Sequence, residues 1–159
     1  MSEHKQLPFF VYGTLLPDQP NFVLFGEAIT AMEPAIFHGG QLYDMGYYPM
    51  LVRDEAGTAV SGQLISVNPS EYEAVVQQLD ALEGYDPADL DNSEYHRLVV
   101  EVMVANGRTQ TAWVYLGQAK FVTDKLIIPD GDWAAHVAQN QPKLQEWWQD
   151  IDTVAGLHK

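Results

Sequence analysis

One carboxyl group stands out in this sequence because it shares a face with hydrophobic side chains. Residues 68–85 predict a helix with an apolar stripe, formed by Tyr72, Val75, Val76, Leu79 and Leu82. At about 100° per residue, Glu83 falls near the middle of that stripe, in the last turn before Gly84. Burial and the helix dipole both disfavour an ionised carboxylate there, so we expect a raised pKa. Glu83 is therefore either an acid–base catalyst or a buried acid with a specific partner, such as Arg97 or a tyrosine hydroxyl.

A second stretch that could do chemistry follows the first predicted strand. The apolar run 7–11 leads into Tyr12-Gly13-Thr14-Leu15 and then into a proline-rich segment. A glycine at that point permits a close approach of the backbone, and successive N–H groups in such a loop can bind an anion. An ordinary strand-to-loop turn explains the same pattern and stays open as the alternative.

The elements that must position these residues are short strands with glycine kinks. Strands are predicted over residues 7–11, 36–43, 60–67, 95–104 and 109–116, with a bulge or bend at Gly39-Gly40 and a hairpin at Asn106-Gly107. In the strand 95–104, the alternation places Leu98 with the core side and Tyr95 on the opposite side. The pattern predicts an α+β fold, a small mixed or antiparallel β-barrel with a central helix and C-terminal helices packed on it.

The last part of the chain has a different pattern. Trp133 and His136 have helical spacing after Asp132, and Trp147 and Trp148 lie in a second short helical piece. We therefore divide the chain into a barrel domain, residues 1–118, and a C-terminal helical extension, residues 119–159, packed on the same domain. Its tryptophans are expected in the core or at an interface, which leaves a homodimer open.

The composition excludes several classes of function. The chain has 159 residues, no cysteine and a net charge of -14, so a thiolate nucleophile, a disulfide scaffold and a cysteine zinc site are excluded. With only 8 Lys and Arg residues, the chain lacks the basic surface that nucleic acids or anionic membranes require. No apolar run approaches the roughly 18 residues of a membrane span. We expect no secretory signal and a cytoplasmic location.

No other motif indicates a catalytic centre. The five histidines have no spacing that suits a metal, so we expect no metal site. The serines lack the sequence context of a hydrolase nucleophile.

Four ordered blocks resemble one known family. Tyr12-Gly13-Thr14-Leu15 is similar to the Tyr-Gly-Ser/Thr-Leu signature of the γ-glutamylcyclotransferase-like (AIG2-like) superfamily. The other three blocks are Gly40 to Asp44 with Tyr48-Pro49, Leu79 to Tyr85, and Tyr95-His96-Arg97. Their order and spacing agree with the family over roughly Phe9 to Leu116, and no motif was matched from Ala119 to Lys159.

The resemblance implies a reaction and a set of site residues. It implies a small mixed barrel, an acid–base glutamate at Glu83, and a substrate cradle made by the backbone of Tyr12, Gly13, Thr14 and Leu15. The typical family reaction is the attack of the α-amine of a γ-glutamyl group on its own γ-carbonyl, which releases 5-oxoproline. The family often has a tyrosine near the position of Tyr115, whose hydroxyl could reach the pocket. The alternative for Tyr115 is a tyrosine at the edge of the core.

We expect an enzyme that acts on a small γ-glutamyl compound without a cofactor. Two other interpretations stay open. The chain could be a non-catalytic small-molecule binding module on the same fold, or an interaction protein that uses its Trp-rich C-terminal segment. An unpaired Glu83 beside an open cavity would favour the enzyme, whereas an ion pair of Glu83 with Arg97 would favour the binding module.

Overall fold

The computed structural model describes residues 6–17, 19, 21–46, 48–54, 57–128 and 131–138 of the chain. Its seven strands are β1 (Phe9–Val11), β2 (Ile29–Asp44), β3 (Pro49–Arg53), β4 (Thr58–Val67), β5 (Tyr95–Met103), β6 (Thr109–Gly117) and β7 (Leu126–Ile127). The one longer helix is α1 (Tyr72–Leu82). Short 3-10 turns are η1 (Phe22–Phe25), η2 (Pro69–Glu71), η3 (Leu90–Asn92), η4 (Ala105–Gly107) and η5 (Ala119–Phe121).

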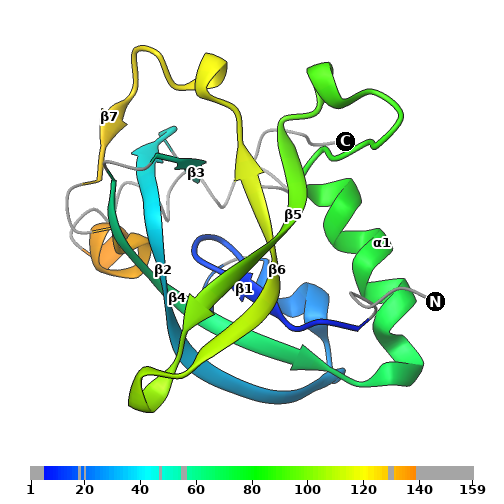
Figure 1. Cartoon of the computed structure of the whole chain (residues 1–159). Helices are drawn as coiled ribbons and strands as arrows, with labels where there is room; N and C mark the ends of the chain where they lie inside the picture. The colour runs from blue at the N-terminus through cyan, green and yellow to red at the C-terminus, as the bar shows by residue number, and fades with distance from the viewer. Residues whose placement is uncertain are drawn as a thin grey trace.

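The strands form a mixed barrel that closes on itself (Figure 1). The sheet order is β3-β2-β4-β1-β6-β5, and β2 also pairs with β5 through Ile36 and Met103. Five strands, β2-β4-β1-β6-β5, therefore make a closed ring. β3 and β7 each pair with β2, so they extend the sheet beside the ring. This is the α+β barrel expected from the sequence.

The direction of β1 brings two strand ends together at one end of the barrel. β1 pairs antiparallel with β4 and parallel with β6, with Phe9 opposite Trp113. Parallel neighbours end at the same edge of a sheet. The chain after β1, beginning at Tyr12, therefore lies beside the end of β6, near Tyr115.

The long strand β2 bends at the predicted glycine pair. Its register against β4 shifts between His38 and Gly40, and Gly39 has φ of 93°, which a residue with a side chain rarely adopts. Before the bend β2 pairs with β4, and from Gly40 to Asp44 it pairs with β3. Because of the bend, β2 is part of the closed ring through β4 and also pairs with β3 outside the ring.

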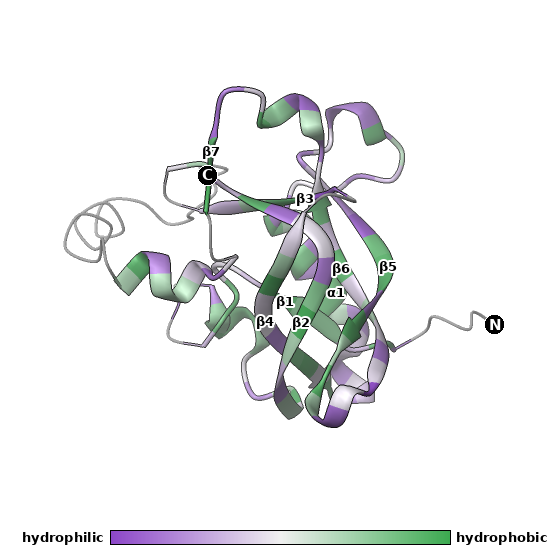
Figure 2. Cartoon of the chain, turned by 60° about the vertical axis from the view of Figure 1, so that its left-hand side comes forward, coloured by the Kyte–Doolittle hydropathy of each residue, from purple (hydrophilic) through white to green (hydrophobic). Residues whose placement is uncertain are grey.

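Helix α1 follows directly on the 3-10 turn η2 and packs on β1. The predicted N-cap Asn68 caps η2, because the Ser70 N–H donates to its Oδ1 at 3.0 Å, whereas the residue before α1, Glu71, makes no side-chain cap. Tyr72, Val75 and Leu79 are buried along the helix, and the Tyr72 ring stacks on Phe9 at 5.5 Å. Figure 1 shows α1 against the outside of the barrel, and Figure 2 shows hydrophobic and hydrophilic residues alternating along the strands.

The β5–β6 hairpin confirms one prediction and corrects another. Asn106 and Gly107 form its turn with φ of 68° and 73°. The alternation predicted for β5 is wrong near its start, because Tyr95 is buried and Leu98 is 42% exposed. The side of a strand that becomes buried is the side on which other elements lie. At Tyr95 that cover comes from Pro49, whose carbonyl accepts the Tyr95 hydroxyl at 2.8 Å.

The described residues after β6 pack on the barrel. They comprise η5, β7 and a short helix over residues 133–138, in which Trp133 is fully buried. Trp147, Trp148 and the rest of residues 139–159 lie outside the described residues. Within the described ranges, no helix is both long and apolar enough to cross a membrane.

Candidate active site

The end of α1 fixes the backbone of Glu83. Glu83 is the residue that closes the helix, and its N–H donates to the carbonyl of Leu79 at 2.9 Å. Gly84 follows with φ of 70°, and the N–H of Tyr85 returns to the carbonyl of Asp80 at 3.0 Å. This is a Schellman ending, which needs the left-handed conformation that glycine adopts easily. The sequence Glu-Gly-Tyr therefore ends the helix with Glu83 in a defined position.

The loop after β1 faces Glu83. Its turn is closed by a bond from the Leu16 N–H to the Gly13 carbonyl at 3.0 Å. A side chain at Gly13 would place its Cβ 2.6 Å from Cγ of Pro49, so the predicted close approach is a packing contact with that ring. Among the described residues, the N–H groups of Gly13, Thr14 and Leu15 donate to no backbone carbonyl. These three donors are therefore not used in backbone hydrogen bonds within the described part of the chain.

Asn21 holds the side chain of Thr14. Its Nδ2 donates to Thr14 Oγ1 at 3.2 Å, and its backbone N–H donates to the Thr14 carbonyl at 2.9 Å. Since Thr14 Oγ1 accepts from Asn21, its own proton is free to be donated elsewhere. Sequence reasoning did not identify Asn21.

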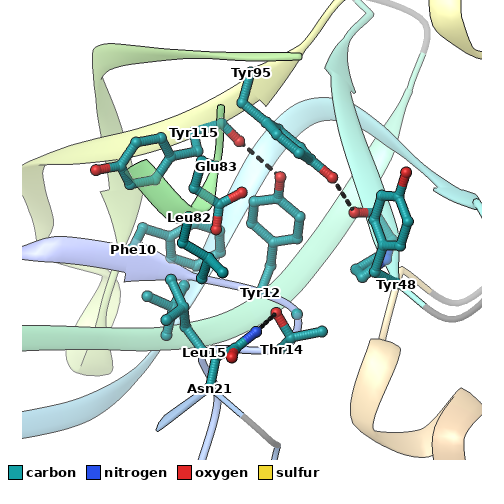
Figure 3. A pocket seen from close by; sticks show the side chains of 13 residues that line it. Phe10, Tyr12, Thr14, Leu15, Asn21, Tyr48, Leu82, Glu83, Tyr95 and Tyr115 are labelled. Carbon is teal, nitrogen blue, oxygen red and sulfur yellow. Dashed lines mark hydrogen bonds between the residues drawn. The ribbon is translucent and has the colours of Figure 1, made fainter. Parts of the chain in front are cut away.

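A pocket brings all of the predicted site residues together. Its empty space is about 460 Å³, a figure that includes the part open to solvent. In Figure 3 the Glu83 carboxylate points toward the loop that carries Thr14 and Leu15. The predicted residues that line the pocket are Tyr12, Gly13, Thr14, Leu15, Glu83 and Tyr115. The lining residues that were not predicted to form the site are Phe10, Val11, Asn21, Tyr48, Pro49, Leu82 and Tyr95.

The environment of Glu83 disfavours its ionised form. Burial of the carboxyl group, followed by the negative charges of Glu94 and Asp80, raises the pKa of Glu83 from 4.5 to about 8. The residue keeps an intermediate exposure because the pocket is open, although protein atoms surround the carboxyl group. Among the described residues, no hydrogen bond or ion pair holds the Glu83 carboxylate. It is therefore a carboxyl group with a raised pKa that lines a cavity and has no partner among the described residues.

A second carboxyl group lies near the first. The Tyr48 hydroxyl donates to Oε2 of Glu94 at 2.8 Å. Burial raises the pKa of Glu94, and the bond from Tyr48 opposes that effect. Sequence reasoning gave Glu94 no role. The signal that could have found it is Tyr48, the partner of Glu94, which belongs to one of the four family-like blocks.

Two tyrosines of the pocket donate their hydroxyl protons to backbone carbonyls of the protein. The Tyr12 hydroxyl donates to the carbonyl of Tyr115 at 2.6 Å, and the Tyr95 hydroxyl donates to the Pro49 carbonyl. Burial raises the pKa of both phenols, so they stay protonated. Their oxygens can therefore only accept hydrogen bonds from a bound molecule.

Tyr115 and Arg97 both bind Asp80. The Tyr115 ring lines the pocket, but its hydroxyl donates to Oδ1 of Asp80 at 2.6 Å and points away from Tyr12 (Figure 3). Arg97 donates through Nε to the same oxygen at 2.8 Å. The ion pair of Arg97 is therefore with Asp80, so Glu83 does not have Arg97 as its partner.

Within the described residues, no group of three or more His, Asp or Glu side chains is arranged to hold a metal ion. His136, in the helix over residues 133–138, binds Asp44 at 2.9 Å, at the far end of β2. The polar side chains that line the pocket are those of Glu83, Thr14 and Asn21 and of the tyrosines Tyr12, Tyr48, Tyr95 and Tyr115.

Comparison with known proteins identifies a family. The family model described as gamma-glutamyl cyclotransferase, AIG2-like, matches residues 9–135. A Vibrio cholerae protein that is provisionally named gamma-glutamylcyclotransferase is 34% identical over 136 residues, 80% of this chain and 96% of that protein.

Solved structures show the same fold. An AIG2-like protein from Mus musculus has a TM-score of 0.58 at 24% identity, over 76% of this chain and 82% of that chain. YkqA from Bacillus subtilis has a TM-score of 0.63 at 23% identity, over 86% of this chain, which spans only 42% of YkqA. The sequence match and the barrel together show that the chain belongs to the gamma-glutamyl cyclotransferase, AIG2-like family.

Proposed function

We propose that this protein is a γ-glutamylcyclotransferase that releases 5-oxoproline from a small γ-glutamyl compound, with Glu83 as the general acid and base. The observation that carries the proposal is the Glu83 carboxyl group, which is unpaired among the described residues and has a pKa of about 8. It faces the Tyr12 to Leu15 loop across one pocket. A carboxyl group held only for stability would have a partner.

The reaction requires two protons to move from one nitrogen to another. The α-nitrogen begins as an ammonium group and ends as the N–H of the lactam, so it loses two protons. The leaving nitrogen begins as an amide N–H and ends as an ammonium group, so it gains two. A new bond forms between the α-nitrogen and the γ-carbonyl carbon, and the bond from that carbon to the leaving nitrogen breaks.

Glu83 can carry these protons one at a time. It first accepts a proton from the α-ammonium group, which frees the amine to attack, and it then protonates the leaving nitrogen. The raised pKa of Glu83, about 8, makes its carboxylate a stronger base than an ordinary one and still leaves the carboxyl group able to give the proton back near neutral pH, as one group in both roles requires.

The opposite wall supplies donors for the negative part of the substrate. The N–H groups of Gly13, Thr14 and Leu15, with the Thr14 hydroxyl, suit the α-carboxylate of the γ-glutamyl group or the oxyanion of the tetrahedral intermediate. Oriented amides attract an anion locally. They would therefore hold an anionic substrate in a protein whose net charge is -14.

The test is the release of 5-oxoproline from a panel of γ-glutamyl amino acids and γ-glutamylamines. We expect wild-type turnover of at least one compound and a loss of roughly 100-fold or more in kcat for Glu83→Gln. Glu73→Gln is the matched control, because Glu73 is an exposed glutamate on the same helix. Absence of product from the whole panel, or full activity of Glu83→Gln, would refute the proposal.

The binding-module interpretation has less support, because it was expected to pair Glu83 with Arg97, whereas Arg97 binds Asp80. The interaction-protein interpretation stays open: Trp133 is buried in the core, but Trp147 and Trp148 lie outside the described residues. Tight binding of a γ-glutamyl compound without turnover would restore the binding-module interpretation.

A further inference from the structure

Asp80 lies one turn before Glu83 on α1, and two side chains from the barrel hold its carboxylate. Arg97 donates from Nε to Oδ1 at 2.8 Å and from a terminal nitrogen to Oδ2 at 3.3 Å. The Tyr115 hydroxyl donates to Oδ1 at 2.6 Å. Both oxygens of Asp80 are therefore bonded, whereas Glu83 on the same helix has no such bond among the described residues.

The two donors are themselves fixed by the sheet. Arg97 of β5 and Tyr115 of β6 are direct partners in the antiparallel register. The Arg97 guanidinium also lies over the Trp113 ring at 4.4 Å and over the Tyr85 ring at 5.6 Å. A bidentate and stacked arginine loses little further freedom when it binds a carboxylate. This arrangement forms a rigid clamp, which we define as Asp80, Arg97 and Tyr115.

The clamp reaches both walls of the pocket. The carbonyl of Asp80 accepts the N–H of Tyr85 at 3.0 Å, the bond that ends α1 directly after Glu83. The carbonyl of Tyr115 accepts the Tyr12 hydroxyl at 2.6 Å, at the start of the opposite loop. One connected set of bonds therefore sets the end of the helix relative to the loop.

We propose that Asp80 is a positioning residue that, held by Arg97 and Tyr115, fixes Glu83 in register with the Tyr12 to Leu15 loop. This inference rests on the proposed function, in which Glu83 must exchange protons with two different nitrogens. Helix ends fray easily, and a misplacement of about 1 Å can reduce a rate by roughly 100-fold. The Schellman ending fixes Glu83 relative to its own helix, and the clamp fixes that helix end relative to β5 and β6.

The charges of Asp80 and Arg97 in the clamp also affect the pKa of Glu83, each in a direction that can be tested. The charge of Asp80 contributes to the raised pKa of Glu83, after burial and the charge of Glu94. The other titratable groups around the pocket are the phenols of Tyr12, Tyr48, Tyr95 and Tyr115. Arg97 partly neutralises Asp80. Removing the charge of Asp80 should therefore lower the Glu83 pKa, and removing Arg97 should raise it.

The experiment compares Asp80→Asn, Arg97→Gln and Tyr115→Phe with the control Glu73→Gln in the full chain. The Glu83 pKa is measured by ¹³C NMR of labelled glutamate carboxyl groups, with the Glu83 signal identified from Glu83→Gln. We expect a pKa below about 8 in Asp80→Asn, a higher pKa in Arg97→Gln, and no change in the control. We also expect kcat to fall by about 10- to 100-fold in Asp80→Asn, with KM changed much less.

Two results would overturn the proposal. One is an unchanged Glu83 titration in both Asp80→Asn and Arg97→Gln. The other is an unchanged kcat in Tyr115→Phe while kcat falls in Asp80→Asn. Tyr115→Phe keeps the ring and removes only one bond to Asp80, so a smaller loss of kcat is expected of it. A wild-type protein without turnover would instead refute the proposed function, and the titration would still decide whether the clamp acts on Glu83.

Discussion

Glu83→Gln should abolish turnover and at the same time stabilise the folded protein at alkaline pH. The pKa of Glu83 is raised in the folded state, so folding disfavours its ionised form. Below the ordinary pKa of 4.5, the carboxyl group is protonated in both states and has no such effect. As the pH rises from 4.5 to about 8, the unfolded chain ionises first and folded stability is lost. Glutamine cannot ionise, so the variant avoids this loss.

The size of the effect follows from the pKa. Each pKa unit corresponds to about 1.4 kcal/mol, so a rise from 4.5 to about 8 corresponds to at most about 5 kcal/mol. The pocket is open to solvent and Glu83 keeps an intermediate exposure, which reduces the penalty. We therefore expect Glu83→Gln to gain roughly 1–3 kcal/mol in the free energy of unfolding between pH 5 and pH 9.

The assay is urea unfolding of wild type, Glu83→Gln and the exposed control Glu73→Gln at pH 5, 7 and 9. The quantity of interest is the difference from wild type as a function of pH, because effects of the other titrating groups largely cancel in it. We expect a difference that increases with pH for Glu83→Gln and a constant difference for Glu73→Gln. A constant difference for Glu83→Gln would mean that Glu83 has an ordinary pKa, and the acid–base argument would fail with it.

Three further predictions concern the surroundings of the site. Glu94→Gln removes a charge that raises the Glu83 pKa, so the pH–rate profile of kcat/KM should reach its plateau at a lower pH than in wild type. Gly13→Ala places a methyl group 2.6 Å from Cγ of Pro49 and should cost roughly 1–3 kcal/mol in urea unfolding; adding Pro49→Ala should recover part of this loss, and no recovery would contradict the clash. Trp133→Ala should cost roughly 3–5 kcal/mol because Trp133 is fully buried. Val23→Ala, at a side chain that is 75% exposed, should change the same measurement by less than about 0.5 kcal/mol.

Local patterns in the sequence predicted the parts of the fold that depend on local rules. The cap at Asn68, the stripe of α1 and the stop at Gly84 follow from helix geometry alone, and all three are observed. The Asn106-Gly107 turn and the bend at Gly39 follow from the φ values that glycine and asparagine permit. These features need no knowledge of distant residues.

The remaining pocket residues could not be predicted because distant segments place them. Tyr95 is covered by Pro49, and Asn21 bonds to Thr14. The residues next to Tyr95 and Asn21 in the sequence indicate neither contact. The partner of Tyr115 could not be predicted either, because Asp80 reaches it only once α1 packs across β5 and β6. The sequence indicated that Arg97 would pair with an acidic residue, but nothing in it showed which Asp or Glu that residue would be.

The parallel pairing of β1 with β6 has a consequence for the protein during its synthesis. Phe9 of β1 contacts its neighbour near Trp113, so a ribosome must add about a hundred residues before that side of β1 is covered. At about 5–20 residues per second, the interval is roughly 5–20 s. During this time β1, whose residues Phe9 to Val11 are all buried in the native fold, presents an open hydrophobic edge. We expect the nascent chain to be most prone to aggregation, and to recruit chaperones, in this interval and not after release.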